Sequence, residues 1–174
     1  DGALRFATPA GEKRLRADAV VLALGGGSWA KLGSDGAWVP LLAAREIAVA
    51  PLQPSNCGFD GAWSEHLASR HAGEPLKSVG LRLAGDAAWR IGEFVITHEG
   101  VEGSAIYALS ARLREAIARD GVAVLELDLA PERSQDWLAQ QIAHPRGSRS
   151  LASHLASRTG IKGLKMALLR EVLP

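Results

Sequence analysis

The stretch Val20-Val21-Leu22-Ala23-Leu24-Gly25-Gly26-Gly27 decides how the first part of the chain is interpreted. Residues 20–24 are apolar without interruption, and three glycines end the run. A strand that is apolar at every position is typical of one buried on both faces, as in a parallel sheet covered by helices. Residues 36–48 follow with apolar side chains at helical spacing. The sequence therefore predicts a strand, a glycine loop and a helix in that order.

Upstream of this stretch, the sequence predicts a β-hairpin, because residues 4–8 and 13–17 flank the turn-rich residues 9–12. A strand buried on both faces needs neighbouring strands and covering helices. The sequence offers one such strand and at most one helix to cover it. We therefore expect this chain to be an internal piece of a longer protein. The alternatives are that residues 20–24 join the other strands of the chain in one mixed sheet, or that a second copy supplies the neighbours.

A second region begins after residues 51–56, where two prolines and the lack of a helical period predict a crossing between domains. Apolar residues alternate with others over 79–84, and a second extended stretch covers 89–96. This pattern predicts an antiparallel sheet with one solvated face. Residues 122–129 predict a further strand, with leucines on one face and carboxylates on the other.

Helices are predicted between and after these strands. Helical spacing indicates one amphipathic helix that begins at Ser104 and ends at Gly121, which stands where a C′ glycine belongs. Its apolar stripe consists of Ile106, Leu109, Leu113 and Ile117. From residue 131 onward the pattern is helical, with Ser134 and Ser150 as candidate N-caps. Together these elements predict an α+β fold.

The composition is that of an ordinary soluble globular protein, with 47% hydrophobic and 22% charged residues among 174. The net charge of +1 supplies no large field, so we expect neither a nucleic-acid nor a membrane partner. No apolar run approaches the roughly 20 residues that span a bilayer, and no signal peptide is visible. The single cysteine, Cys57, fits a reducing compartment. We expect a cytoplasmic protein.

Several motifs follow one another along the chain. The run Ala23-Leu24-Gly25-Gly26-Gly27-Ser28-Trp29 precedes Gly33-Ser34-Asp35-Gly36. Later come Pro51-Leu52-Gln53-Pro54, Ile96-Thr97-His98-Glu99-Gly100-Val101-Glu102-Gly103 and Leu127-Asp128-Leu129-Ala130-Pro131. In this order they resemble the BaiN-like family of NAD(P)/FAD-dependent flavoproteins. The chain departs from the family pattern at Leu24, Ala30 and Glu102, where the family usually has Thr, Pro and Ser.

The resemblance implies a molecule of three parts. Residues 1–50 would be the last part of a Rossmann-like FAD-domain segment, 51–130 an inserted antiparallel β-barrel-like domain, and 131–174 a small helical bundle. FAD would accept hydride from NAD(P)H and pass it to an organic small-molecule substrate. The Gly-x-Gly-x-x-Gly fingerprint, which presents backbone N–H groups to the pyrophosphate, is absent from the sequence. We therefore expect this chain alone not to retain FAD.

The candidate cofactor-binding residues are Gly25, Gly26, Gly27 and Ser28, because open α/β sheets bind ligands at the carboxyl ends of their strands. The alternative is a tight turn that needs a positive φ. Among histidines, His98 lies in a matched motif and is a candidate proton donor. The alternative is a structural loop histidine. No spacing of histidine, cysteine and carboxylate residues predicts a metal site, and the catalytic residues are otherwise unknown.

Two further hypotheses concern partners. A barrel and a helical bundle also suit a non-catalytic binding module for a protein or RNA, although the near-neutral net charge counts against RNA. An uncovered apolar strand edge is a template for association. The sequence therefore predicts a homodimer, with residues 20–24 or the adjacent hairpin at the contact.

Overall fold

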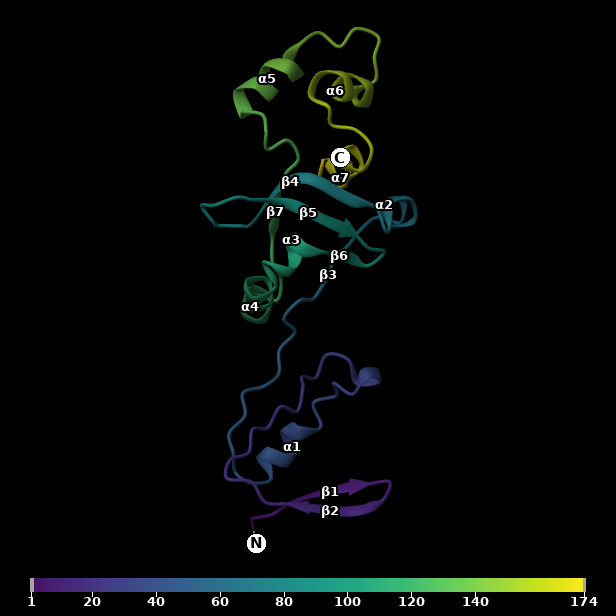
Figure 1. Cartoon of the computed structure of the whole chain (residues 1–174). Coiled ribbons are helices and arrows are strands. Elements are labelled where there is room, and N and C mark those ends of the chain that lie inside the picture. Colours follow the sequence, from purple (N-terminus) through teal and green to yellow (C-terminus); the bar gives the residue numbers. More distant parts are fainter. Residues whose placement is uncertain (1, 174) are drawn as a thin grey trace. The chain divides into compact units, whose positions relative to one another are not determined.

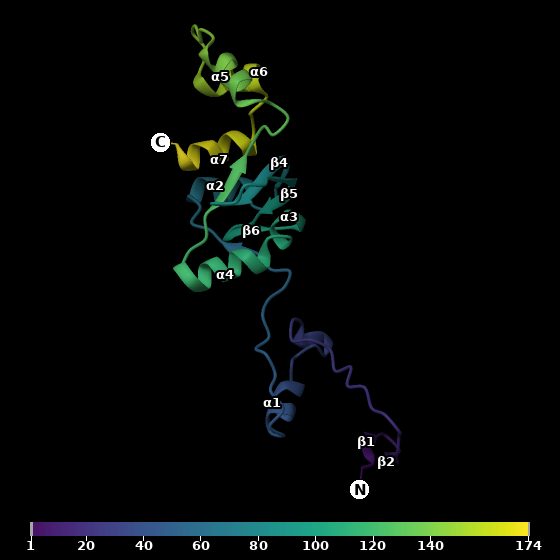
Figure 2. The same cartoon turned by 90° about the vertical axis from the view of Figure 1, so that its left-hand side faces the viewer.

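The computed structural model of the chain describes residues 2–173. They divide into two compact units, with the boundary between Gln53 and Pro54. Figures 1 and 2 show the first unit in purple and blue and the second in teal, green and yellow. No helix within residues 2–173 is long and apolar enough to cross a membrane.

The first unit contains a hairpin and a short helix. Strand β1 (Leu4–Thr8) pairs with β2 (Gly11–Leu15) across a two-residue turn, so the predicted hairpin is confirmed, with its second strand starting two residues earlier than expected. A 3₁₀ turn, η1 (Ala30–Leu32), and helix α1 (Trp38–Ala43) follow. Pro40 lies in the first turn of α1, where its missing N–H removes no helical hydrogen bond.

Residues 20–24 do not form the predicted strand, and this prediction is wrong for the chain as it stands. Their apolar side chains are exposed, and Val21 reaches 89%. A strand is held by hydrogen bonds to a neighbouring strand, and in the described part of the first unit β1 and β2 pair only with each other. The composition of this stretch is that of a buried strand, but no strand in the described part of the unit pairs with it.

The second unit is built on a five-stranded antiparallel sheet in the order β3-β6-β5-β4-β7. Its strands are β3 (Phe59–Asp60), β4 (Pro75–Leu83), β5 (Arg90–Ile96), β6 (Gly100–Glu102) and β7 (Leu125–Asp128). The sheet curls into a half-barrel, which confirms the predicted α+β class with an antiparallel barrel-like part. Strand β4 lies between β5 and β7 and pairs with both.

The helices of the second unit are α2 (Glu65–His71), α3 (Ser104–Tyr107), α4 (Ser110–Asp120), α5 (Gln135–Ala143), α6 (Leu151–Thr159) and α7 (Leu164–Val172). Ser134 and Ser150 cap α5 and α6 through their hydroxyl oxygens, as predicted. Gly121 ends α4 with a φ of 79°, which also confirms the predicted C′ glycine. The division near residue 130 into a barrel and a helical part stays a prediction.

The predicted helix from Ser104 is two helices. Leu109 interrupts it, and its N–H bonds to the carbonyl of Ile106 in a tighter turn, at 2.9 Å. The hydroxyl of Ser110 donates to the same carbonyl at 3.3 Å and so competes with the regular helical bonds. Ile117, expected in the buried stripe, is 38% exposed and lies at the edge of the core, where it lines an apolar cavity with Leu113.

A β-bulge sets the face that β4 presents to the core. Leu76 pairs with Phe94 and Val79 with Gly92, so three steps along β4 match two along β5. The extra residue is taken up at Ser78, whose φ of 50° lies in the left-handed region. Because side chains alternate along a strand, this extra residue allows Leu76 and Val79 to be buried together.

One core fills the curled sheet and includes helices from both ends of the second unit. Its members come from β4, β5, α2, α3, α4 and α7 and from the junction of α3 and α4: Leu67, Leu76, Val79, Leu81, Phe94, Ile96, Ile106, Leu109, Leu113, Leu164 and Leu168. The ammonium of Lys165, on α7, donates to the carbonyls of Ser78 at 3.0 Å and Leu129 at 2.7 Å. Helix α7 is thus fixed both to the core and to the bulge.

A second tie joins α7 to α2, which lie side by side in Figures 1 and 2. Ser64 caps α2 by accepting the N–H of Leu67, and it donates its own N–H and hydroxyl to Glu171, at 2.9 and 2.5 Å. These two donors lower the pKa of Glu171 below its ordinary value. A carboxylate 107 residues away thus binds the first turn of α2.

We expect Leu113→Asp to destabilise the second unit by several kcal/mol, because it places an unpaired charge in the core. Ala118→Asp is the matched control: it introduces the same charge on α4 at an exposed position. Thermal unfolding followed by circular dichroism measures both. Equal losses of melting temperature in the two variants would contradict the burial of Leu113 in the core.

The Ser64–Glu171 tie should make stability depend on acid. The pKa of Glu171 is depressed in the folded state, so its contribution is present above the unfolded value of about 4.3 and is lost as pH falls through the folded value. The melting-temperature difference between wild type and Glu171→Gln should therefore shrink from pH 7 to pH 3. Glu132→Gln, at an exposed position, is the control. A difference independent of pH would contradict a charged tie.

The homodimer stays a prediction, and the exposed apolar side chains of residues 20–24 give it a direct test. Sedimentation of the chain at tens of micromolar should show a dimer, which Val21→Lys should dissociate. Leu32→Lys changes another exposed apolar residue, 77% accessible, in the same unit and should leave the dimer intact. A monomeric wild type would exclude this contact.

Candidate functional site

The glycine loop of residues 25–27 is held against the start of α1. The indole N–H of Trp38 donates to the carbonyl of Gly25 at 3.0 Å, and the N–H of Gly36 donates to the carbonyl of Gly26 at the same distance. Trp29 and Ser34 exchange backbone hydrogen bonds of 2.9 and 3.1 Å, which close the turn between these segments. The loop is therefore ordered by its own unit, although its residues are exposed.

The three glycines of the loop have different reasons to be glycine. Gly25 has a φ of 77°, which side chains rarely adopt. At Gly27 a Cβ would come within 2.7 Å of a methyl group of Leu52. At Gly26 the backbone is ordinary, and a Cβ would meet only the hydroxyl of Ser34, at 3.4 Å. Neither conformation nor packing within the unit explains Gly26, whereas the close approach of a ligand would.

The loop fits one part of a flavin dinucleotide site and not another. An exposed stretch of three glycines, residues 25–27, followed by the small side chain of Ser28, suits contact with the flat face or edge of a nucleotide cofactor. A pyrophosphate needs several converging N–H groups, as in a Gly-x-Gly-x-x-Gly turn at a helix N-terminus. The sequence contains no such fingerprint. Gly25, Gly26, Gly27 and Ser28 would therefore touch the cofactor without holding its phosphates.

His98 lies in the second unit, at the exposed turn between β5 and β6. The turn is closed by the N–H of Thr97, which donates to the carbonyl of Gly100 at 2.9 Å. Within the described residues, the imidazole takes part in no hydrogen bond or ion pair that would orient it. The glycine loop and His98 belong to different units, so the structure does not bring the two predicted sites together.

Sequence reasoning missed an apolar cavity in the second unit. Its volume is about 560 Å³, and it lies where β3 and β6 face β7 and α4. Its apolar lining includes Phe59, Trp63, Phe94, Val101, Leu113 and Leu127. Asp60 is the charged residue in the lining, and the indole N–H of Trp63 is fixed by the carbonyl of Gly100 at 2.9 Å. These residues are far apart in sequence, so the sequence signals, alternation in β7 and the apolar stripe of α4, covered only part of the lining.

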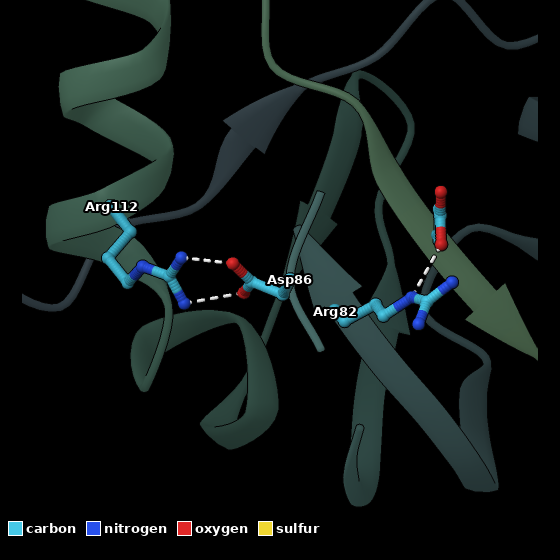
Figure 3. Close-up of polar contacts among 4 residues, drawn as sticks. Arg82, Asp86 and Arg112 are labelled. Atoms are coloured by element: carbon cyan, nitrogen blue, oxygen red, sulfur yellow. Dashed lines mark hydrogen bonds and ion pairs between the residues drawn. The ribbon is translucent and has the colours of Figure 1, made fainter. Parts of the chain in front are cut away.

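A cluster of ion pairs fixes the turn between β4 and β5, as Figure 3 shows. The guanidinium of Arg112, on α4, donates to both carboxylate oxygens of Asp86. Arg82 donates to Glu126 at 2.6 Å, between β4 and β7, and its guanidinium lies 4.3 Å from the ring centre of Trp89. These contacts tie the turn to α4 and join two strands.

The chemistry of this cluster is structural. The hydrogen bonds from Arg112 hold the pKa of Asp86 below its ordinary value, and the same contact raises the pKa of Arg112. A carboxylate that stays ionised and is bound at both oxygens is neither a proton donor nor a free base. Within residues 2–173, no three His, Cys, Asp or Glu side chains gather closely enough to hold a metal ion.

Comparison with known proteins places the second unit in a family. The family model described as the HI0933-like protein barrel and H2TH domain matches residues 53–172. No curated protein matches the chain. The matched residues cover more than half of the chain and contain the curled sheet and the helices that follow it. The chain therefore belongs to the HI0933-like family, which is part of the FAD-dependent oxidoreductase group.

Proposed function

We propose that the chain is part of a BaiN-like flavoprotein that transfers hydride from NAD(P)H, through FAD, to a small organic acceptor. Membership in the HI0933-like family is the observation that carries the flavin part of this proposal. The motifs from Ala23 to Pro131, in the order of the BaiN-like family, support the finer assignment. The nicotinamide and the organic acceptor rest on that resemblance alone.

The residues of the chain have limited roles in this proposal. The flavin supplies the electron chemistry when it is bound, and the protein binds it, orients it and excludes water. The backbone of residues 25–28 provides a contact surface for the cofactor, with Gly26 at the point of closest approach. His98 is exposed and so accessible to a substrate, which keeps it as the candidate proton donor.

The flavin content of the longer protein that carries this chain tests the proposal. Gly26→Val places a branched side chain where the cofactor approaches, so we expect the purified variant to contain several-fold less FAD per protein than the wild type. Absorbance of the bound flavin, relative to protein, measures this ratio. Within the unit, a Cβ at Gly26 meets only the hydroxyl of Ser34, at 3.4 Å, so the substitution should leave the fold intact. A lower FAD content would then come from steric exclusion of the cofactor.

Ala10→Val is the control, since it adds the same branched bulk at an exposed position in the turn between β1 and β2. It should leave the FAD content unchanged. A Gly26→Val variant with as much FAD as the wild type would show that the glycine loop is a tight turn that does not contact the cofactor. A wild-type protein without flavin would overturn the proposed oxidoreductase and leave the non-catalytic binding module as the alternative.

A further inference from the structure

The net charge of +1 conceals a strong separation of charge along the second unit. Residues 54–130 contain seven Lys and Arg against eleven Asp and Glu, whereas residues 131–173 contain seven against three. The contrast is sharpest over residues 137–170, which carry six Lys and Arg and no Asp or Glu at all. The helical part is therefore strongly basic, and the sheet that precedes it is acidic.

The cations of the helical part are not neutralised by carboxylates. Within the described residues, all the salt bridges of the second unit lie before residue 131, and none involves a Lys or Arg of residues 131–173. Lys165 is engaged by two backbone carbonyls. Arg149 donates to the hydroxyl of Ser157 at 3.3 Å, which orients it without reducing its charge. Arg146 and Lys162 are exposed.

Four of these cations lie at the two ends of α6, which packs beside α5 (Figures 1 and 2). Arg146 and Arg149 are in the loop before α6, and Arg158 and Lys162 are in its last turn and the loop after it. A nine-residue helix is about 13 Å long. The positive charge is thus spread over a distance that covers several phosphates of a nucleic-acid strand, which are about 3.4 Å apart along a duplex axis.

We propose that the α5–α6 hairpin binds the phosphate backbone of nucleic acid without sequence preference, through Arg146, Arg149, Arg158 and Lys162 at the two ends of α6. The partner meets the local charge and not the net charge, because electrostatic fields are screened over about 8–10 Å at physiological salt. The acidic sheet therefore does not cancel the attraction of the hairpin. This inference goes beyond the proposed oxidoreductase and does not depend on it.

The side chains between the cations favour nucleic acid over an anionic membrane. Membrane-surface helices present an apolar stripe beside their cations, whereas α6 exposes one large apolar side chain, Leu151, buries Leu155, and exposes Ser153 and Ser157. The loop before α6 adds exposed Gly147 and Ser148. Hydroxyls and free backbone N–H groups are common partners of phosphate oxygens in protein–nucleic acid contacts.

Fluorescence anisotropy of the 174-residue chain with a fluorescein-labelled 20-nucleotide RNA and a 20-base-pair DNA duplex tests the proposal. At physiological salt we expect a Kd of about 10⁻⁴–10⁻⁶ M, with tighter binding at 50 mM salt and steep weakening as salt rises to 200 mM. The triple variant Arg146→Gln, Arg158→Gln, Lys162→Gln should reduce the slope of log Kd against log salt by about 2 to 3, since each lost phosphate contact removes about 0.7–0.9.

Two further variants keep the result interpretable. Arg5→Gln, Lys13→Gln, Arg16→Gln removes the same charge from exposed positions of the first unit and should change the slope by less than half as much. Arg146→Gln, Lys162→Gln alters only two exposed side chains, so it preserves the fold even if the change at the half-buried Arg158 does not. It should reduce the slope by about 1.4 to 1.8. Circular dichroism confirms that each variant is folded.

Several results would overturn the proposal. These are failure to bind either oligonucleotide at 50 mM salt, or equal weakening by the triple variant and its charge-matched control. Binding to phosphatidylserine vesicles without binding to the oligonucleotides would assign the hairpin to a membrane instead. Salt-sensitive self-association that the triple variant abolishes, again without oligonucleotide binding, would assign it to the acidic sheet of a second copy.

Discussion

The β-bulge in β4 is the constraint on which the second unit depends. It lets Leu76 and Val79 share the buried face, although they are three residues apart on a strand whose side chains alternate. Without the extra residue, one of the two would point away from the core. The left-handed backbone at Ser78 has an energetic cost of order 1 kcal/mol, and the ammonium of Lys165 bonds to the carbonyl at this position.

The bulge also explains why α7 belongs to this core despite its distance along the sequence. Lys165 bridges the bulge and the end of β7, which places Leu164 and Leu168 against the sheet. Glu171, one helical turn beyond Leu168, then reaches the N-cap of α2. A local irregularity in one strand is thus connected to the position of a helix and to the start of another.

Much of the fold could be predicted from sequence because the signals were local. Alternation predicted the antiparallel strands, hydroxyl caps predicted the starts of α5 and α6, and Gly121 predicted the end of α4. The failures were of two kinds. Residues 20–24 have the composition of a strand, but a strand also needs a partner, which composition does not supply. The break at Leu109 depends on the hydroxyl of Ser110, which helical spacing does not detect.

In the candidate site, too, local features could be predicted from sequence and long-range contacts could not. The sequence located the glycine loop, but only the structure separates Gly26 from Gly25 and Gly27, because the difference lies in a backbone angle and one close contact. The cavity and the Ser64–Glu171 tie join residues too far apart for any pattern to reveal. The charge separation was present in the sequence from the start, and a single net value for the whole chain concealed it.

The open edges of the half-barrel have a consequence for its native fluctuations. Within the described residues, β3 pairs only with β6 and β7 only with β4, while β5 has a neighbour on each side. Backbone amides at such edges exchange their hydrogens through small local openings, whereas amides of a central strand require larger ones. Both edge strands also line the apolar cavity. The parts of the cavity wall that β3 and β7 form should therefore open before the part that the central strand β5 forms, so access to the cavity follows the fraying of the sheet edges.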